Sequence, residues 1–131
     1  MKPGTVSDLK AMLTGMSPKL SARAWAFHAI ADATFLPETA FALIREEEGM
    51  TCIIPAQAAP ADAPQFAKIT LQVHSDLEAV GLTAAVSTAL ATSGIACNVI
   101  AGAHHDHLFV QWDRREEALG LLEKLSTDAR R

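Results

Sequence analysis

Three histidines and an aspartate follow one another in the run HHDH at residues 104–107. Imidazole and carboxylate groups are common ligands of zinc and iron, so this run could hold a metal ion. Known metal motifs more often place their ligands one helical turn apart or in separated pairs, and further imidazoles come only from His28 and His74. Two interpretations stay open: a metal site, or a turn whose histidines bind backbone groups or a small molecule.

A second candidate is an anion site at residues 75–81, where a strand is expected to end and a helix to begin. Free backbone N–H groups and the positive end of the helix dipole converge at such a corner, so a carboxylate would bind well there. Gly81 costs a helix about 1 kcal/mol relative to alanine. It therefore either lets a ligand approach the backbone or lets the helix pack closely on the sheet.

Other polar residues give less specific signals. Asn98 lies within an apolar strand-like run, where its amide needs a partner: a ligand or a neighbouring loop. Three adjacent glutamates at residues 46–48 precede Gly49, and acids at a hairpin turn are usually solvated. Gly-x-Ser-x-Gly and phosphate-binding glycine loops are absent from the sequence, so we expect no catalytic residue, no metal requirement and no cofactor.

Residues 68–124 predict a β-α-β-β-α unit, an α+β arrangement of the ferredoxin-like type. Apolar residues at 69, 71 and 73 alternate with polar ones, as in a half-buried strand. The alanine-rich run that follows predicts a helix, with Gly94 just past its end. The expected elements are strands at 69–73, 95–101 and 108–112, and helices at 77–92 and after Asp113.

The unit lacks the fourth strand of a complete ferredoxin-like sheet, so we expect that strand to come from the N-terminal half. This half predicts an α-β-β-β order, with a helix at 6–14, a strand at 23–30 and a hairpin within 41–54. The turn-prone stretch at 56–64 is the best candidate linker. The predicted halves are residues 1–60 and 65–131, packed together or sharing a sheet.

Composition limits the classes of protein further. The 131 residues include 15 acidic and 11 basic side chains, for a formal charge of −4, and no basic face for nucleic acid is visible. No apolar run is long enough to predict a membrane span. Cys52 and Cys97 lie among apolar neighbours and read as buried thiols. We therefore expect a cytoplasmic protein with no nucleic-acid or membrane partner.

The stretch ITLQVHSDLEAVGLTAAVSTALATSGIACNVIAGAHHDHLFV, residues 69–110, resembles an ACT domain, a module that senses amino acids beside biosynthetic enzymes. The part LEAVGLTAAVSTALATSGIACNVIA is similar to the aspartokinase-type pattern. The upstream TAFALIREEEGMT and the downstream NVIAGAHHDHLFV together resemble a family of small stand-alone bacterial proteins built from two ACT-like halves.

The resemblance implies tandem ferredoxin-like halves, association into a homodimer, and an amino acid or related carboxylate bound beside the first strand-helix loop. One departure is that Ser-Asp-Leu-Glu at residues 75–78 replaces the aspartate-x-proline-glycine loop of many ACT domains. The ligand-binding residues that it implies are Ser75, Asp76, Leu77, Glu78, Ala79, Val80, Gly81 and Asn98.

These observations favour a non-catalytic regulatory protein whose allosteric effector is amino-acid-like. One alternative is a metal-binding protein or enzyme that uses His104, His105, Asp106 and His107. Another is a purely structural dimerisation module that assembles through the apolar helix expected at residues 77–92.

Overall fold

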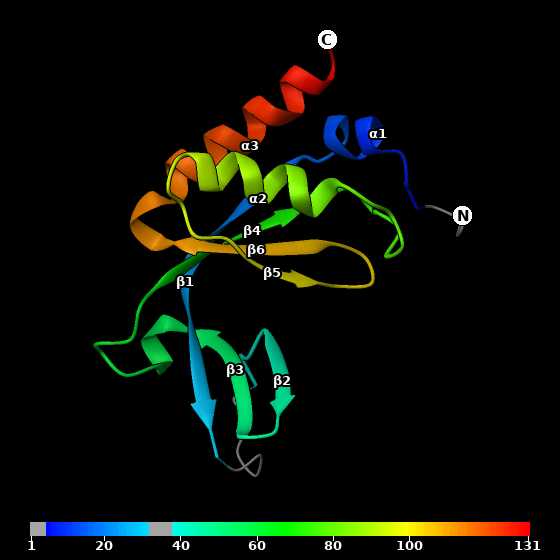
Figure 1. Cartoon of the computed structure of the whole chain (residues 1–131). Helices are drawn as coiled ribbons and strands as arrows, with labels where there is room; N and C mark the ends of the chain where they lie inside the picture. Colours follow the sequence, from blue (N-terminus) through cyan, green and yellow to red (C-terminus); the bar gives the residue numbers. More distant parts are fainter. Residues whose placement is uncertain (1–4, 32–37) are drawn as a thin grey trace. The chain divides into compact units, whose positions relative to one another are not determined.

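The computed structural model describes residues 5–31 and 38–131 and shows a mixture of helices and strands (Figure 1). The order is α-β-β-β followed by β-α-β-β-α, which confirms the predicted α+β, ferredoxin-like class. The elements are α1 (Leu9–Thr14), β1 (Pro18–Ile30), β2 (Ala42–Glu46), β3 (Gly49–Pro55), η1 (Ala56–Ala58), β4 (Phe66–Leu71), α2 (Leu82–Thr92), β5 (Asn98–Ala101), β6 (Asp106–Gln111), η2 (Trp112–Arg114) and α3 (Arg115–Ala129).

The chain divides into two compact units, one of residues 22–66 and a larger one of residues 1–21 and 67–131. This division differs from the predicted halves, 1–60 and 65–131, because strand β1 continues from one unit into the other. The halves remain a prediction about how the chain is built from two similar segments. No helix in the described ranges has the length and apolar run needed to cross a bilayer.

In the larger unit, strand β4 is hydrogen-bonded to β1 on one side and to β6 on the other, with β5 beyond β6. Strand β1 is therefore the fourth strand that the sequence led us to seek in the N-terminal half. Strands β5 and β6 run antiparallel, with Asn98 opposite Phe109 and Ala101 opposite Asp106. Strand β6 begins at Asp106 rather than at Leu108 as predicted, because its pairing with β5 extends to the hairpin turn.

One apolar core joins the strands and three helices of the larger unit. Strand β4 contributes every second residue, as a strand with one buried face must. Helix α2 contributes residues four apart, which lie on one side of a helix. The buried members are Met12, Met16, Ala67, Ile69, Leu71, Val73, Leu82, Val86, Leu90, Ile95, Leu108, Val110, Ala118 and Leu122.

Helix α2 begins at Leu82, so the helix predicted at 77–92 starts five residues too early. The carboxylate of Asp76 accepts a hydrogen bond from the N–H of Glu78 at 2.9 Å, which closes a local turn in place of a helical one. Gly81 then has φ of +110°, a conformation that no helix interior contains and that glycine adopts most readily. The two features delay the helix.

The other end of α2 follows its prediction closely. The N–H of Ile95 donates to the carbonyl of Leu90 at 3.0 Å, and the N–H of Gly94 donates to that of Ala91 at 2.9 Å. With φ of +71° at Gly94, this is the double hydrogen-bond pattern that commonly ends helices. Because Ile95 belongs to this cap, β5 begins only at Asn98, three residues after the predicted start.

The N-terminal elements also differ from their predicted bounds. Helix α1 begins at Leu9 rather than at residue 6, with the Asp8 side chain accepting a hydrogen bond from the N–H of Ala11. Val6 instead forms a parallel bridge with Ser75. Strand β1 begins at Pro18, five residues before the predicted start.

The smaller unit is a three-stranded antiparallel arrangement in the order β2-β3-β1. Trp25 packs edge-on against Phe41 with ring centroids 5.9 Å apart, and Phe27 packs against Phe66 at 5.3 Å. Such edge-to-face pairs add about 0.5–1.5 kcal/mol beyond the burial of area. Among its described residues the smaller unit has no helix longer than η1. The aromatic pairs therefore help to stabilise it.

A comparison of Gly94 with Gly120 separates the effect of backbone conformation from the effect of packing. A Cβ added at either Gly94 or Gly120 would have no atom within 4 Å, but only Gly94 has a positive φ. We expect Gly94→Ala to lower the free energy of unfolding by about 1–2 kcal/mol. Gly120→Ala, inside α3, should raise it by about 0.5–1 kcal/mol. Urea unfolding followed by circular dichroism tests both; shifts in the same direction would contradict the assignment.

Candidate functional site

A cavity of about 140 Å³ lies at the corner between β4 and α2, within the larger unit. Five of the eight predicted ligand-binding residues line it. The lining residues are Met12, Ser75, Asp76, Leu77, Ala79, Gly81, Leu82, Thr83, Ala101 and Asp106. The structure therefore brings most of the predicted loop to one cavity and adds residues from α1, α2, β5 and β6.

Backbone hydrogen bonds fix the loop that lines this cavity. The N–H of Val6 donates to the carbonyl of His74 at 2.8 Å, and the N–H of Asp76 donates to the carbonyl of Val6 at 2.9 Å. The N–H of Ala79 closes the next turn on the carbonyl of Asp76 at 2.9 Å. A loop held in this way keeps its polar groups in place before a ligand arrives, which lowers the entropy lost on binding.

The first turn of α2 gives the cavity one positively polarised wall. The N–H groups of Leu82 and Thr83 belong to the first turn, so they have no partner within the helix. Both residues line the cavity. A Cβ at Gly81 would lie 3.2 Å from the side-chain carbons of Leu9, so glycine lets the chain pack closely against Leu9 just before the helix. The helix start is therefore a good place for a carboxylate.

Two aspartates and a serine give the cavity its negative and hydrogen-bonding groups. The hydroxyl of Ser75 donates to a carboxylate oxygen of Asp106 at 3.5 Å, a long hydrogen bond that joins the loop to strand β6. One oxygen of Asp76 is occupied by the N–H of Glu78. The hydrogen bond to Asp106 is the longer of the two, so Asp106 is the carboxylate more open to a positively charged ligand group.

Three of the predicted residues lie away from the cavity lining. Glu78 and Val80 are exposed on the outside of the loop, and Val80 has 84% of its surface accessible. Asn98 lies at the opposite end of β5 from Ala101, and its amide donates to the carbonyl of Phe109 at 3.4 Å. The amide of Asn98 therefore has a partner within the hairpin.

The sequence analysis missed Asp106 as a residue of this cavity. Asp106 shares its strand face with Leu108 and Val110, both of which are in the core. That alternation could have indicated that Asp106 points to the helix side of β6. For Met12 and Ala101 the sequence carries no such signal, because their neighbours depend on the packing of separate elements.

The four residues of the HHDH run do not form one site. The Nδ1 atom of His107 is 2.9 Å from the hydroxyl of Thr70. Burial, followed by the positive charges of Lys68 and His105, lowers the pKa of His107, so its neutral form is favoured. Asp106 faces Ser75. No three His, Cys, Asp or Glu side chains among the described residues are placed to hold a metal ion.

His104 and His105 instead meet His74, which follows strand β4. The ring centroids are 5.4 Å apart for His74 and His104, 6.5 Å for His74 and His105, and 6.4 Å for His104 and His105. We call these three residues the histidine cluster. His74 and His105 are the sequence neighbours of Ser75 and Asp106, the two residues whose side chains meet in the cavity.

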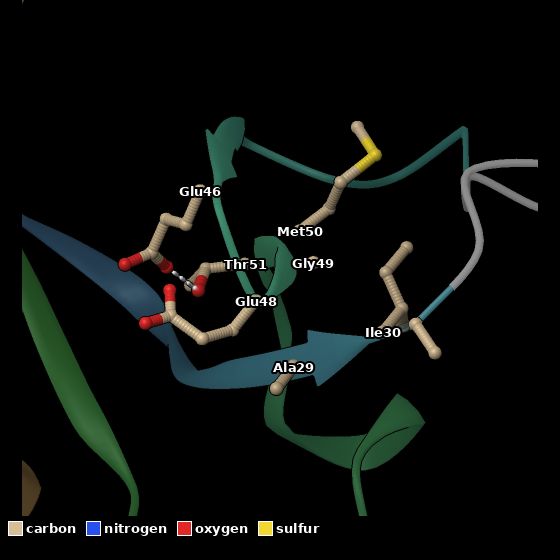
Figure 2. A pocket seen from close by; sticks show the side chains of 8 residues that line it. Ala29, Ile30, Glu46, Glu48, Gly49, Met50 and Thr51 are labelled. Atoms are coloured by element: carbon tan, nitrogen blue, oxygen red, sulfur yellow. Dashed lines mark hydrogen bonds between the residues drawn. The ribbon is translucent and has the colours of Figure 1, made fainter.

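The smaller unit contains a larger, more open pocket of about 310 Å³ (Figure 2). Its lining comes from the end of β1 and the turn between β2 and β3, with Glu46, Glu48 and Thr51 on one side. The Thr51 hydroxyl donates to the Glu46 carboxylate. All three glutamates at residues 46–48 are exposed, which confirms that they are solvated acids. None of the predicted ligand-binding residues lines this pocket.

Comparison with known proteins places the chain in a family. Two family models, both described as ACT domain, match residues 4–69 and 64–124. The chain is 43% identical to a protein of unknown function from Vibrio cholerae, VC0802, described as a possible transport protein. That similarity covers 86% of this chain and 92% of the other, with a TM-score of 0.76. No match was found among curated proteins.

Two less similar structures share the fold. The regulatory subunit of aspartate kinase from Thermus flavus is 12% identical, with a TM-score of 0.57 over 82% of this chain and 95% of that one. Aspartate kinase from Clostridium acetobutylicum is 11% identical, with a TM-score of 0.63 over 82% of this chain and 34% of that one. The family matches, the identity to the Vibrio protein and the shared fold lead to one conclusion: the chain belongs to the ACT domain family.

Proposed function

We propose that this protein is a non-catalytic regulatory protein that binds a small amino acid, or a related carboxylate, in the cavity between β4 and α2. The observation that carries the proposal is that the cavity has a positively polarised side and a negatively charged side. The first turn of α2 offers free N–H groups to a carboxylate, and Asp106 with Ser75 offers acceptors to an ammonium group. A zwitterion has both groups.

The size of the cavity narrows the ligand class. The cavity measures about 140 Å³. Pockets for drug-sized ligands usually measure about 300 Å³ or more. We therefore expect glycine, alanine, serine or a compound of similar size to bind more tightly than tryptophan or arginine.

The family supports a regulatory role without catalysis. The chain belongs to the ACT domain family, and a structure with the same fold is the regulatory subunit of aspartate kinase from Thermus flavus. The cavity holds carboxylates and hydroxyls but none of the histidines, so it lacks the imidazole base of a serine-type catalytic site. We infer that bound ligand acts by changing how the protein interacts with a partner.

A homodimer and a cytoplasmic location are parts of the same proposal. Helix α2 buries Leu82, Val86 and Leu90 in the core, so an assembly surface would use the loop before it. Leu77 and Val80, three residues apart in this loop, have 61% and 84% of their surface exposed, and exposed apolar side chains are candidates for an interface. Both cysteines are free, in agreement with a reducing compartment.

A thermal-shift screen of the twenty amino acids tests the ligand class. At 100 times its dissociation constant, a ligand adds about 2.7 kcal/mol to the free energy of unfolding, so the melting temperature should rise measurably for at least one small amino acid. The corresponding amine and carboxylic acid, tested separately, should each give a smaller rise. A screen in which every amino acid leaves the melting temperature unchanged at millimolar concentration would contradict the proposal.

Asp106→Asn tests the position of the site. It keeps the size of the side chain but removes the charge expected to bind the ammonium group, a bond worth about 1.5–3 kcal/mol. The dissociation constant of the best amino acid should therefore rise about tenfold or more. Glu46→Gln, in the pocket of the smaller unit, is the matched control and should leave that constant unchanged. Equal effects of the two variants would place the ligand elsewhere.

Sedimentation equilibrium tests the dimer. We expect the unmodified chain to sediment as a dimer and Val80→Glu to sediment as a monomer, since a carboxylate buried at an interface costs several kcal/mol. Leu43→Glu is the control, because Leu43 is an exposed apolar residue of β2 in the other unit. A monomeric unmodified protein, or a monomer produced only by Leu43→Glu, would be inconsistent with an interface at Leu77 and Val80.

A further inference from the structure

We propose that Met12 sets the upper size limit of the ligand that the cavity between β4 and α2 accepts. The inference rests on the proposed function and deepens it, because it assigns a specificity-determining residue to that site. Met12 lies in α1, whereas the polar lining residues belong to the loop after β4, the first turn of α2 and strand β6. Met12 can therefore be changed without removing a group that holds the charges of the ligand.

The inner end of the cavity is apolar. Met12 and Leu82 are large apolar lining residues with 0% and 4% of their surface exposed, so they form the closed end. Leu77 also lines the cavity but is mostly exposed, which places it at the outer rim. Ala79 and Ala101 each contribute a single methyl group to the lining. The depth available to a ligand is therefore limited by Met12 and Leu82.

The side chain of a bound amino acid has to use this apolar end. In the proposed function the carboxylate lies at the N–H groups of Leu82 and Thr83, and the ammonium group lies at Asp106. These contacts occupy the polar walls and leave the apolar lining for the side chain. Leu82 contributes to the carboxylate wall as well, whereas Met12 contributes a side chain from a separate helix. Met12 is therefore the residue that limits size alone.

The atoms of Met12 and those of the ligand compete for the same space. Protein interiors are closely packed, so a larger ligand fits only where protein atoms are removed. Met12→Ala removes the Cγ, Sδ and Cε atoms, and free methionine carries the same three atoms beyond its own Cβ. One methylene group changes the preference of an apolar pocket by about 10- to 200-fold. An unbranched apolar amino acid such as methionine should therefore fit the enlarged cavity.

Isothermal titration calorimetry of the full chain with free alanine and free methionine tests the inference. The unmodified chain should bind alanine more tightly than methionine. In Met12→Ala, the ratio of the dissociation constant of methionine to that of alanine should fall by about tenfold or more. Saturating methionine should also raise the melting temperature of Met12→Ala more than alanine does.

Met16→Ala is the matched control. Met16 is as fully buried as Met12 and belongs to the same core, but it is not among the described lining residues of the cavity. Its loss should lower stability and leave the ratio of dissociation constants unchanged. Met12→Val and Met16→Val remove less volume and give the same comparison if an alanine variant does not fold; only Met12→Val should lower the ratio.

The failure of this inference can be distinguished from failure of the proposed function. An unmodified chain that binds no amino acid would overturn both. Binding of alanine to the unmodified chain, with the same ratio in the Met12 variants, would overturn the role of Met12 alone. An equal fall of the ratio in the Met12 and Met16 variants would also overturn it, because a general loosening of the core would then explain the change.

Discussion

Two backbone hydrogen bonds made by Val6 hold the corner on which the candidate site depends. They connect Val6 to His74 and to Asp76, just beyond the end of β4. Backbone polar groups that leave a sheet need other partners, and here a residue from the N-terminal segment supplies them. Because the backbone carries these contacts, the side chains of residues 74–76 are available for other interactions.

The corner at residues 74–76 and the β5–β6 turn contribute side chains to two places. Ser75 and Asp106 meet in the cavity between β4 and α2, whereas their neighbours His74 and His105 meet in the histidine cluster. Successive residues of an extended chain point in different directions, so each segment can contribute to both places. This arrangement explains why a run that looks like one metal motif in the sequence is divided among three environments.

Local patterns were enough to predict the order of elements in the fold. The alternation at 69–73 predicted β4, although the strand itself ends at Leu71, and Gly94 predicted the end of α2. The start of α2 was misjudged because Leu77, Ala79 and Val80 have a helix-like composition. A side-chain hydrogen bond at Asp76 and the positive φ of Gly81 prevail over that composition. Such local competition is not visible in an apolar pattern.

The candidate site was predictable only in part. The strand-helix corner follows from sequence, since a helix start after a strand exposes N–H groups in any protein. The roles of Met12, Ala101 and Asp106 depend on which separate elements pack at that corner. Asn98 was considered because an amide within an apolar strand needs a partner, and that amide donates to the carbonyl of Phe109 within the hairpin. The meeting of His74 with His104 likewise requires the pairing of segments distant in sequence.

The most direct test of the account is to locate a bound amino acid by heteronuclear magnetic resonance. Titration with the amino acid that stabilises the protein most should shift the backbone amide signals of residues 75–83 and of Asp106, around the cavity. The signals of residues 29–31 and 46–51, around the pocket of the smaller unit, should stay in place. Shifts confined to that pocket, or no saturable shift at residues 75–83, would contradict the central claim.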